Sequence, residues 1–163
     1  MKKVAIFPGS FDPFTRGHES VVLRALPLFD KVIIAIGNNS SKSGFFSVPE
    51  RIKLIKMVFE DQAQVTVESY DGLTVDFCKN VNAKFMLRGI RTAADFEYER
   101  AVAQMNKSML PDVESVILLT TPELTPVNST IVRDILRHGG DVSQFLPKTM
   151  NVNAILESRN NNA

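Results

Sequence analysis

A segment near the N-terminus combines residue types that together bind a phosphate group. Residues 7–18 read FPGSFDPFTRGH, so an apolar run leads through a glycine-bearing turn to a histidine. If a strand ends and a helix begins here, the first backbone N–H groups of the helix lack intrahelical partners, and the helix dipole adds partial positive charge. An imidazole at that place can donate a further hydrogen bond to an anion. The segment therefore predicts a phosphate site at Ser10, Thr15, Gly17 and His18.

The same turn could serve only close packing of a helix on a strand. Pro8, Gly9 and Ser10 alone would be weak support for a binding site, because such turns are common in α/β proteins. A charged histidine at a helix start is also disfavoured by the dipole, so a purely structural His18 would be neutral and partly exposed. The combination of turn, hydroxyl groups, Gly17 and His18 favours the functional interpretation.

Three later polar segments also follow apolar runs. They are 38–42 (NNSSK), 88–92 (RGIRT) and 124–130 (LTPVNST). In an open parallel sheet, ligands bind beyond the carboxyl ends of the strands, at the place where the strand order reverses. The planar forks of Arg88 and Arg91 suit phosphate oxygens, and Gly89 permits close approach of a ligand to the backbone.

Each of these polar segments has a simpler alternative. Lys42 could be a solvated loop cation, and Ser129 and Thr130 could cap a helix. Arg88 and Arg91 could pair with acids of the following segment, such as Asp95 or Glu99. Capping and phosphate binding use the same free N–H groups, so both roles can hold at Ser129 and Thr130.

Hydrophobic periodicity gives the elements that must position these residues. Short apolar runs at 4–7, 31–36, 65–68, 85–87 and 116–119 predict strands, and their near-continuous apolar character is typical of a parallel sheet covered on both faces. Ser47 and Glu50 form a capping box before a helical pattern, and Gly139 and Gly140 end a helix that begins near Ser129. Met86 and Met105 are expected mainly in the core. The pattern predicts an α/β protein with an open, doubly wound parallel sheet of about five strands.

Length and composition bound the remaining possibilities. With 163 residues and 44% apolar residues, the chain is expected to form one domain over 1–163, with a frayed polar tail at 158–163. The apolar run after the N-terminal lysines is too short for a signal peptide or membrane span, and a net charge of +1 argues against a nucleic-acid surface. The single cysteine, Cys78, suits a reducing compartment. We therefore expect a cytoplasmic protein that binds no nucleic acid and no membrane.

The order and spacing of three motifs add a family resemblance to this pattern. RGIR at 88–91, DFEYE at 95–99 and QMN at 104–106, after the TRGH ending of the first segment, resemble the phosphopantetheine adenylyltransferases among the T/HxGH nucleotidyltransferases. The resemblance implies a Rossmann-like fold and adenylyl transfer from ATP to 4′-phosphopantetheine, giving dephospho-coenzyme A and pyrophosphate, the penultimate step of coenzyme A synthesis. It also implies Mg²⁺ held mainly through the ATP phosphates, coenzyme A as a feedback ligand, and a homohexamer.

The same resemblance implies a role for individual residues. His18 would stabilise the transition state, with Lys42 and Arg91 as further catalytic groups. The acceptor would contact Ser10, Lys42, Thr74 and Arg88. The ATP site would comprise Ser10, Phe11, His18, Gly89, Ile90, Arg91, Glu99, Leu124, Thr125, Pro126, Val127, Asn128, Ser129 and Thr130. The chain departs from the family at two places. The family's serine-rich stretch is replaced by VNST at 127–130, and Pro126 replaces an aromatic residue that is frequent in the family.

The expected reaction needs no strong general base. A phosphate monoester has a second pKa of about 6, so the attacking oxygen of the acceptor phosphate is already largely ionised at neutral pH. Catalysis would then be alignment and charge neutralisation around the α-phosphorus and the departing pyrophosphate. The groups expected to do this are His18, Lys42, Arg88 and Arg91. No metal ligand is assigned to the chain itself.

Two other functions remain open at this point. A related nucleotidyltransferase could use another phosphorylated acceptor, such as a nicotinamide, flavin or glycerol phosphate. A sensor on the same scaffold could bind coenzyme A or a nucleotide without catalysis. A P-loop kinase is disfavoured because the sequence contains no GxxxxGK[ST] motif.

Overall fold

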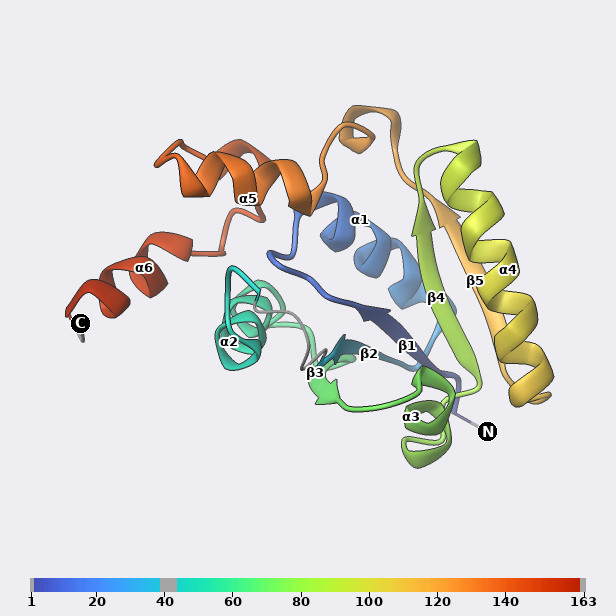
Figure 1. The fold of residues 1–163 in the computed structure, drawn as a ribbon. Coiled ribbons are helices and arrows are strands. Elements are labelled where there is room, and N and C mark those ends of the chain that lie inside the picture. The colour runs from blue at the N-terminus through green and yellow to red at the C-terminus, as the bar shows by residue number, and fades with distance from the viewer. Residues whose placement is uncertain (1, 39–43, 162–163) are drawn as a thin grey trace.

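Five parallel strands form a single sheet at the centre of the computed structural model (Figure 1), which describes residues 2–38 and 44–161. Along the sheet the strands lie in the order β3-β2-β1-β4-β5. The strands are β1 (Val4–Gly9), β2 (Lys31–Gly37), β3 (Val65–Tyr70), β4 (Phe85–Ile90) and β5 (Glu114–Leu119). The predicted fold class and all five predicted strands are confirmed. That the whole chain is one domain stays a prediction.

Alternate residues of the central strands enter two separate cores. Ala5 and Phe7 of β1 belong to one hydrophobic cluster, whereas Ile6 belongs to the other. In β2, Ile34 and Ile33 are divided in the same way. Because side chains alternate across a strand and both faces are covered, the strands read as continuous apolar runs.

In the part of the chain that the structure describes, six α-helices and three short 3₁₀ helices connect and cover the strands. The first cluster includes residues of α1 (Arg16–Ala25), α2 (Val48–Val58), α5 (Ser129–Arg137) and α6 (Val152–Asn161). The second includes residues of α3 (Thr74–Asn80), and α4 (Ala93–Met109) runs alongside β4 and β5 (Figure 1). Among the described residues, no helix is both long and apolar enough to cross a membrane.

Helix ends follow the local signals in the sequence. Ser47 and Glu50 form the predicted capping box of α2, with Ser47 N–H donating to Glu50 Oε2 at 2.7 Å. Helix α5 begins at Ser129 and ends just before Gly139, which has φ of 72° and follows the His138 cap. Both helix predictions are confirmed.

The C-terminal tail differs from the prediction. Helix α6 continues to Asn161, and Arg159 donates to Glu50 Oε1 from Nε at 2.8 Å and to the Phe45 carbonyl from Nη2 at the same distance. Its guanidinium also lies over the rings of Phe45 and Phe46. The expectation of a frayed tail is therefore wrong for 158–161, because an ion pair with a distant helix holds a segment that looks merely polar in sequence.

Strand β4 is longer than its apolar run. The run at 85–87 predicted a strand that ends before Arg88, but the ladder with β5 continues through Arg88↔Ile117, Gly89↔Leu118 and Ile90↔Leu119. Arg88 and Gly89 therefore lie within the strand and not in a loop after it. Backbone pairing sets the end of a strand, and a polar side chain at its carboxyl end does not interrupt that pairing.

Candidate active site

The sheet opens between β1 and β4. These strands pair only at Ala5↔Phe85 and Ile6↔Met86, whereas β1 and β2 stay paired to Gly9↔Ile36. Beyond Ile6 and Met86 the carboxyl ends of β1 and β4 are no longer paired with each other. Strand order reverses at this place, because β2 and β3 lie on one side of β1 while β4 and β5 lie on the other. Ligands of open α/β sheets bind at such a switch point.

Two adjacent pockets occupy this opening. The first, here called the histidine pocket, has a volume of about 360 Å³. It is lined by Phe7, Pro8, Gly9, Ser10, Phe11, Thr15, Gly17, His18, Val21, Arg88, Gly89, Arg91, Asp95, Glu99, Thr120, Val127, Asn128, Ser129 and Thr130. The second, the tyrosine pocket, has a volume of about 270 Å³. Its lining is Pro8, Gly9, Ser10, Gly37, Tyr70, Thr74, Met86, Arg88, Tyr98, Glu99, Val102, Ala103, Asn106 and Ser115.

The two pockets share part of their walls. Pro8, Gly9 and Ser10 at the end of β1 line both, as do Arg88 of β4 and Glu99 of α4. A group bound in one pocket near these residues would therefore lie next to a group bound in the other.

Side chains from distant helices hold the turn after β1 by its carbonyl groups. Arg51 donates to the Ser10 carbonyl at 3.1 Å, Arg133 to the Asp12 carbonyl at 2.7 Å, and Ser129 Oγ to the Pro13 carbonyl at 2.8 Å. These bonds take up carbonyl oxygens, which would repel an anion.

Gly9 and Phe11 fit each other closely within this turn. Phe11 has φ of 48°, and a Cβ on Gly9 would lie 2.8 Å from its ring. Only glycine at position 9 leaves room for the ring, so the PGSF sequence is needed for the shape of the turn.

The His18 ring is held at one nitrogen and free to donate from the other. Its Nδ1 accepts the Thr15 backbone N–H at 3.0 Å, with Thr15 Oγ1 at 3.1 Å. A backbone N–H can only donate, so the neutral ring carries its proton on Nε2. Phe11 and Phe14 pack against the ring, with centroids 5.1 and 5.3 Å from its own.

Electrostatics keep His18 neutral. Loss of solvation, and after it the positive charges of Arg91 and Arg88, together lower its pKa to about 4. At neutral pH the ring therefore offers a hydrogen-bond donor and not a positive charge. Charge neutralisation by His18 itself, which the sequence led us to expect, does not apply to this ligand-free state.

Both site arginines are paired with carboxylates of α4. Arg88 contacts Glu99 through two nitrogens, with Nε to Oε2 at 2.7 Å, and Arg91 Nε lies 3.3 Å from Asp95 Oδ2. Burial opposes ionisation of Asp95, but hydrogen bonds from the Arg91 backbone and side chain lower its pKa. The acid partners considered from the sequence are thus present, while the same two arginines also line the pockets.

The structure brings most of the predicted site residues together. Ten of the fourteen predicted ATP ligands line the histidine pocket: Ser10, Phe11, His18, Gly89, Arg91, Glu99, Val127, Asn128, Ser129 and Thr130. Of the predicted acceptor ligands, Ser10, Thr74 and Arg88 line the tyrosine pocket. Lys42 lies outside the described residues.

Four predicted ATP ligands line neither pocket. Ile90 and Leu124 are buried, Leu124 in the short 3₁₀ helix Pro122–Leu124, and Thr125 Oγ1 donates to the Thr121 carbonyl. Pro126 is exposed before the pocket-lining residues begin at Val127.

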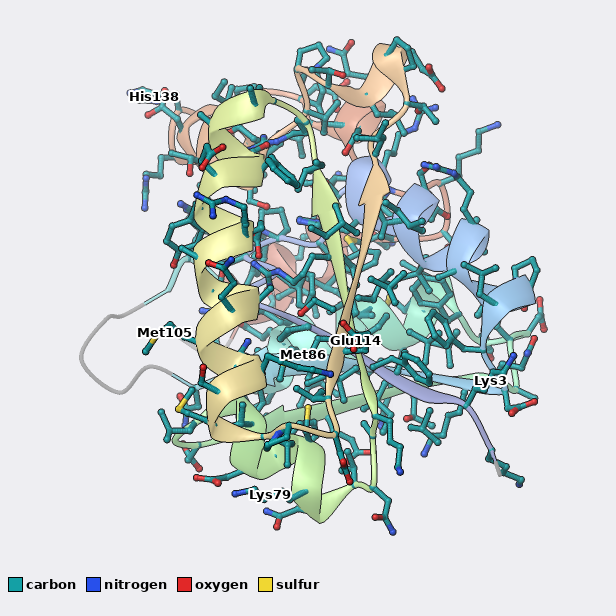
Figure 2. The ribbon with its side chains drawn as sticks, turned by 90° about the vertical axis from the view of Figure 1, so that its right-hand side faces the viewer. Lys3, Lys79, Met86, Met105, Glu114 and His138 are labelled. Carbon is teal, nitrogen blue, oxygen red and sulfur yellow. The ribbon has the colours of Figure 1, made fainter. Side chains whose placement is uncertain are left out.

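Residues that were not assigned a role from the sequence form much of the tyrosine pocket. Tyr70 ends β3, and its hydroxyl lies 2.8 Å from Thr74 Oγ1. Asn106 Nδ2 donates to the sulfur of Met86 at 3.3 Å, so this core methionine also lines the pocket. Met105 was expected in the core, but it is 63% exposed and projects from α4 away from the sheet (Figure 2).

Some of these omissions had a signal in the sequence. Gly37 and Tyr70 occupy the carboxyl ends of β2 and β3, where the rule for parallel sheets places ligands. Tyr98, Val102 and Asn106 are spaced by four residues and share one face of α4. Ser115, near the start of β5, had no such signal.

Comparison with known proteins identifies the class defined by this fold and site. The profile of the family described as "Cytidylyltransferase-like" matches residues 6–135. A bifunctional NMN adenylyltransferase/ADP ribose pyrophosphatase from Francisella tularensis superposes with a TM-score of 0.70 at 21% identity. The match covers 90% of this chain and 45% of that larger one, and at this identity it supports the fold alone.

Closer relatives narrow the class. Phosphopantetheine adenylyltransferase from Cytophaga hutchinsonii is 51% identical over 90% of this chain and 98% of its own length. Those from Bacteroides fragilis and Flavobacterium psychrophilum are 50% and 49% identical over 90% and 91% of this chain, and 97% of each relative is covered. The chain belongs to the phosphopantetheine adenylyltransferase family.

Proposed function

We propose that the protein transfers the adenylyl group of ATP to 4′-phosphopantetheine, with dephospho-coenzyme A and pyrophosphate as products. The observation that carries this proposal is the pair of pockets that share Ser10, Arg88 and Glu99. ATP would occupy the histidine pocket, and the acceptor would occupy the tyrosine pocket. Membership of a family whose relatives carry this activity in their names supports the same assignment.

The histidine pocket offers donors suited to a chain of phosphates. Helix α5 begins at this wall, with Asn128 as its cap and Ser129 and Thr130 in its first turn. The free N–H groups of such a turn favour an anion. Arg91 adds a guanidinium, and His18 adds the Nε2–H donor that its bond to Thr15 leaves available.

The tyrosine pocket suits a chain that alternates apolar and amide groups. Met86 and Val102 give it apolar surface, while the Tyr70 and Thr74 hydroxyls and the Asn106 amide give it hydrogen-bonding groups. Its shared wall places Arg88 where the phosphate end of such a molecule would meet the nucleotide.

The reaction in this arrangement is a direct displacement. A phosphate oxygen of the acceptor forms a bond to the α-phosphorus of ATP, and the bond between that phosphorus and the oxygen bridging to the β-phosphate breaks. Pyrophosphate leaves with the bonding electrons. A dianionic acceptor phosphate has no proton to lose, so His18 serves as a donor to the phosphate oxygens and not as a base.

The proposal includes several accompanying features. Mg²⁺ would enter on the ATP phosphates, and the pairing of both pocket carboxylates, Asp95 and Glu99, with arginines supports this part of the proposal. We also propose a homohexamer, feedback by coenzyme A, and a cytoplasmic location. The last agrees with the buried thiol of Cys78, whose pKa burial raises to about 11.

A two-substrate assay tests the proposed reaction. We would measure pyrophosphate release from ATP and Mg²⁺ with and without 4′-phosphopantetheine, and identify the second product by mass. Dephospho-coenzyme A formed only with both substrates is the expected result. Release only with a nicotinamide, flavin or glycerol phosphate would replace the acceptor, and tight binding without product would indicate a sensor.

A further inference from the structure

Arg88 is held at three points at the boundary of the two pockets. Its Nε and Nη2 both donate to the Glu99 carboxylate, and Nη1 donates to the Pro8 carbonyl at 2.6 Å. A guanidinium has five N–H groups, so two remain uncommitted, one on each terminal nitrogen. Arg88 also lines both pockets, so these two donors are available at the junction.

Both carboxylate oxygens of Glu99 are bonded to Arg88. Only 8% of the residue is exposed, and each carboxylate oxygen accepts from a different nitrogen of the arginine. A two-point contact between planar groups fixes orientation as well as distance. Because Glu99 projects from α4 and Pro8 lies in β1, the two partners hold the guanidinium between a helix and the neighbouring strand.

The second pair at this site is built differently. Asp95 uses one oxygen, Oδ2, for the Arg91 side chain and also for the backbone N–H groups of Arg91 and Thr92. It therefore caps α4, and its pair with Arg91 is a more exposed, single-point contact. The Arg91 guanidinium is correspondingly less constrained than that of Arg88.

We propose that Glu99 is a positioning residue that acts through Arg88. It fixes the guanidinium so that the two uncommitted N–H groups meet the phosphate oxygens at the junction of the pockets. This inference rests on the proposed function for its kinetic consequences. It gives Glu99 a role in addition to the contact with ATP that the family resemblance implies.

Steady-state kinetics of Glu99→Gln test the proposal against a matched control. Glutamine keeps the size of the side chain but removes the charge and one of the two acceptors. Misplacing a positioned group is costly, so we expect kcat/KM for 4′-phosphopantetheine to fall about tenfold or more. Glu97→Gln removes an exposed carboxylate from the same helix, where it pairs with Arg100 outside both pockets, and should leave kinetics unchanged.

A double-mutant cycle separates action through Arg88 from direct contact with ATP. Residues that act as one unit give non-additive effects. In an Arg88→Lys background, which leaves Glu99 paired with a cation, Glu99→Gln should therefore cost little further activity. An equal loss in both backgrounds, seen as a higher KM for ATP, would overturn the proposal, as would wild-type kinetics in Glu99→Gln.

A spectroscopic measurement keeps this test independent of the proposed function. The Arg88 Nε–H signal can be assigned in nitrogen-15 spectra of the ligand-free protein by its loss in Arg88→Lys. In the wild type this proton should exchange slowly with solvent. The protection from exchange should be lost in Glu99→Gln but kept in Glu97→Gln. If the wild-type chain makes no dephospho-coenzyme A but the protection behaves in this way, the proposed function fails and the positioning role stands. Protection unchanged in Glu99→Gln would overturn the positioning role whatever the activity.

Discussion

The two pockets of this protein are built in different ways, although they share one wall. The histidine pocket is made mostly from three continuous segments, namely the turn after β1, the end of β4 and the start of α5. The tyrosine pocket takes a single residue from each of β2, β3, α3, β4 and β5 in addition to the shared wall, and the remaining lining residues come from one face of α4. An anion site uses backbone N–H groups of a turn and a helix start, which need glycine and hydroxyl residues in sequence. A site for an apolar and amide chain uses separate side chains, and apart from the four-residue spacing along α4 they leave no local pattern.

The largest expected effect is in the histidine pocket. His18→Ala should lower kcat by about 10²- to 10³-fold, because it removes a preorganised donor to the phosphate oxygens. His18→Gln, which can still donate from an amide, should lose less. The measurement is kcat with both substrates saturating, and an unchanged kcat in the alanine variant would remove His18 from the transition state.

The two arginines provide the next contrast between the pockets. Arg91 lines only the histidine pocket, so Arg91→Ala should raise the KM for ATP by about tenfold with little effect on the acceptor. Arg88→Ala should chiefly raise the KM for 4′-phosphopantetheine. Arg100→Ala, which removes an exposed arginine of α4 outside both pockets, is the control. The same pattern of KM changes in both site variants would mean that the pockets do not separate the substrates.

A smaller effect is expected in the tyrosine pocket. Tyr70→Phe removes the hydroxyl that lies 2.8 Å from Thr74 Oγ1, and should raise the KM for the acceptor about fivefold, the value of one hydrogen bond. The KM for ATP should not change, and steady-state kinetics in each substrate would check both values. A change in the KM for ATP alone would contradict the assignment of this pocket to the acceptor.

The pH dependence of stability gives the subtlest test of the histidine pocket. His18 has a pKa of about 4 in the folded protein, against 6.5 for an unperturbed histidine. Between these values the unfolded chain binds the proton and the folded chain does not, so the free energy of unfolding should fall as the pH drops from 6.5 towards 4. Denaturant unfolding at pH 7.5 and pH 5 should show a smaller loss in His18→Gln than in the wild type. The pKa of His18, measured by NMR titration, should be higher in Arg91→Ala than in the wild type. A wild-type pKa near 6.5 would contradict the neutral, desolvated state assigned to His18.

The fold was predictable because its signals are local. Apolar runs located all five strands, and the Ser47 and Glu50 capping box located the start of α2. The end of β4 was misplaced since backbone pairing with β5 continues through the polar Arg88. The docking of α6 depends on Arg159 meeting Glu50 from a distant part of the chain, and no local pattern encodes that contact.

The candidate site was predictable to the extent that it is continuous in sequence. The turn that carries Ser10 and the start of α5 were found from residue types alone. The neutral state of His18 was not predicted, since it depends on burial and on two arginines that arrive from β4 and its end. Tyr70 stands at the carboxyl end of β3, where ligands are expected, but Ser115 reaches the tyrosine pocket only through the order of the strands.

The central claim is that the adenylyl group passes directly between the two pockets, and isotope exchange between pyrophosphate and ATP tests it most directly. Labelled pyrophosphate would be incubated with ATP, Mg²⁺ and the protein, with and without dephospho-coenzyme A. Direct transfer predicts label in ATP only when dephospho-coenzyme A is present. Pyrophosphate can form a bond to the α-phosphorus only when the bond from that phosphorus to the phosphopantetheine oxygen breaks. Label in ATP without that compound would indicate an adenylyl-enzyme intermediate and contradict direct transfer.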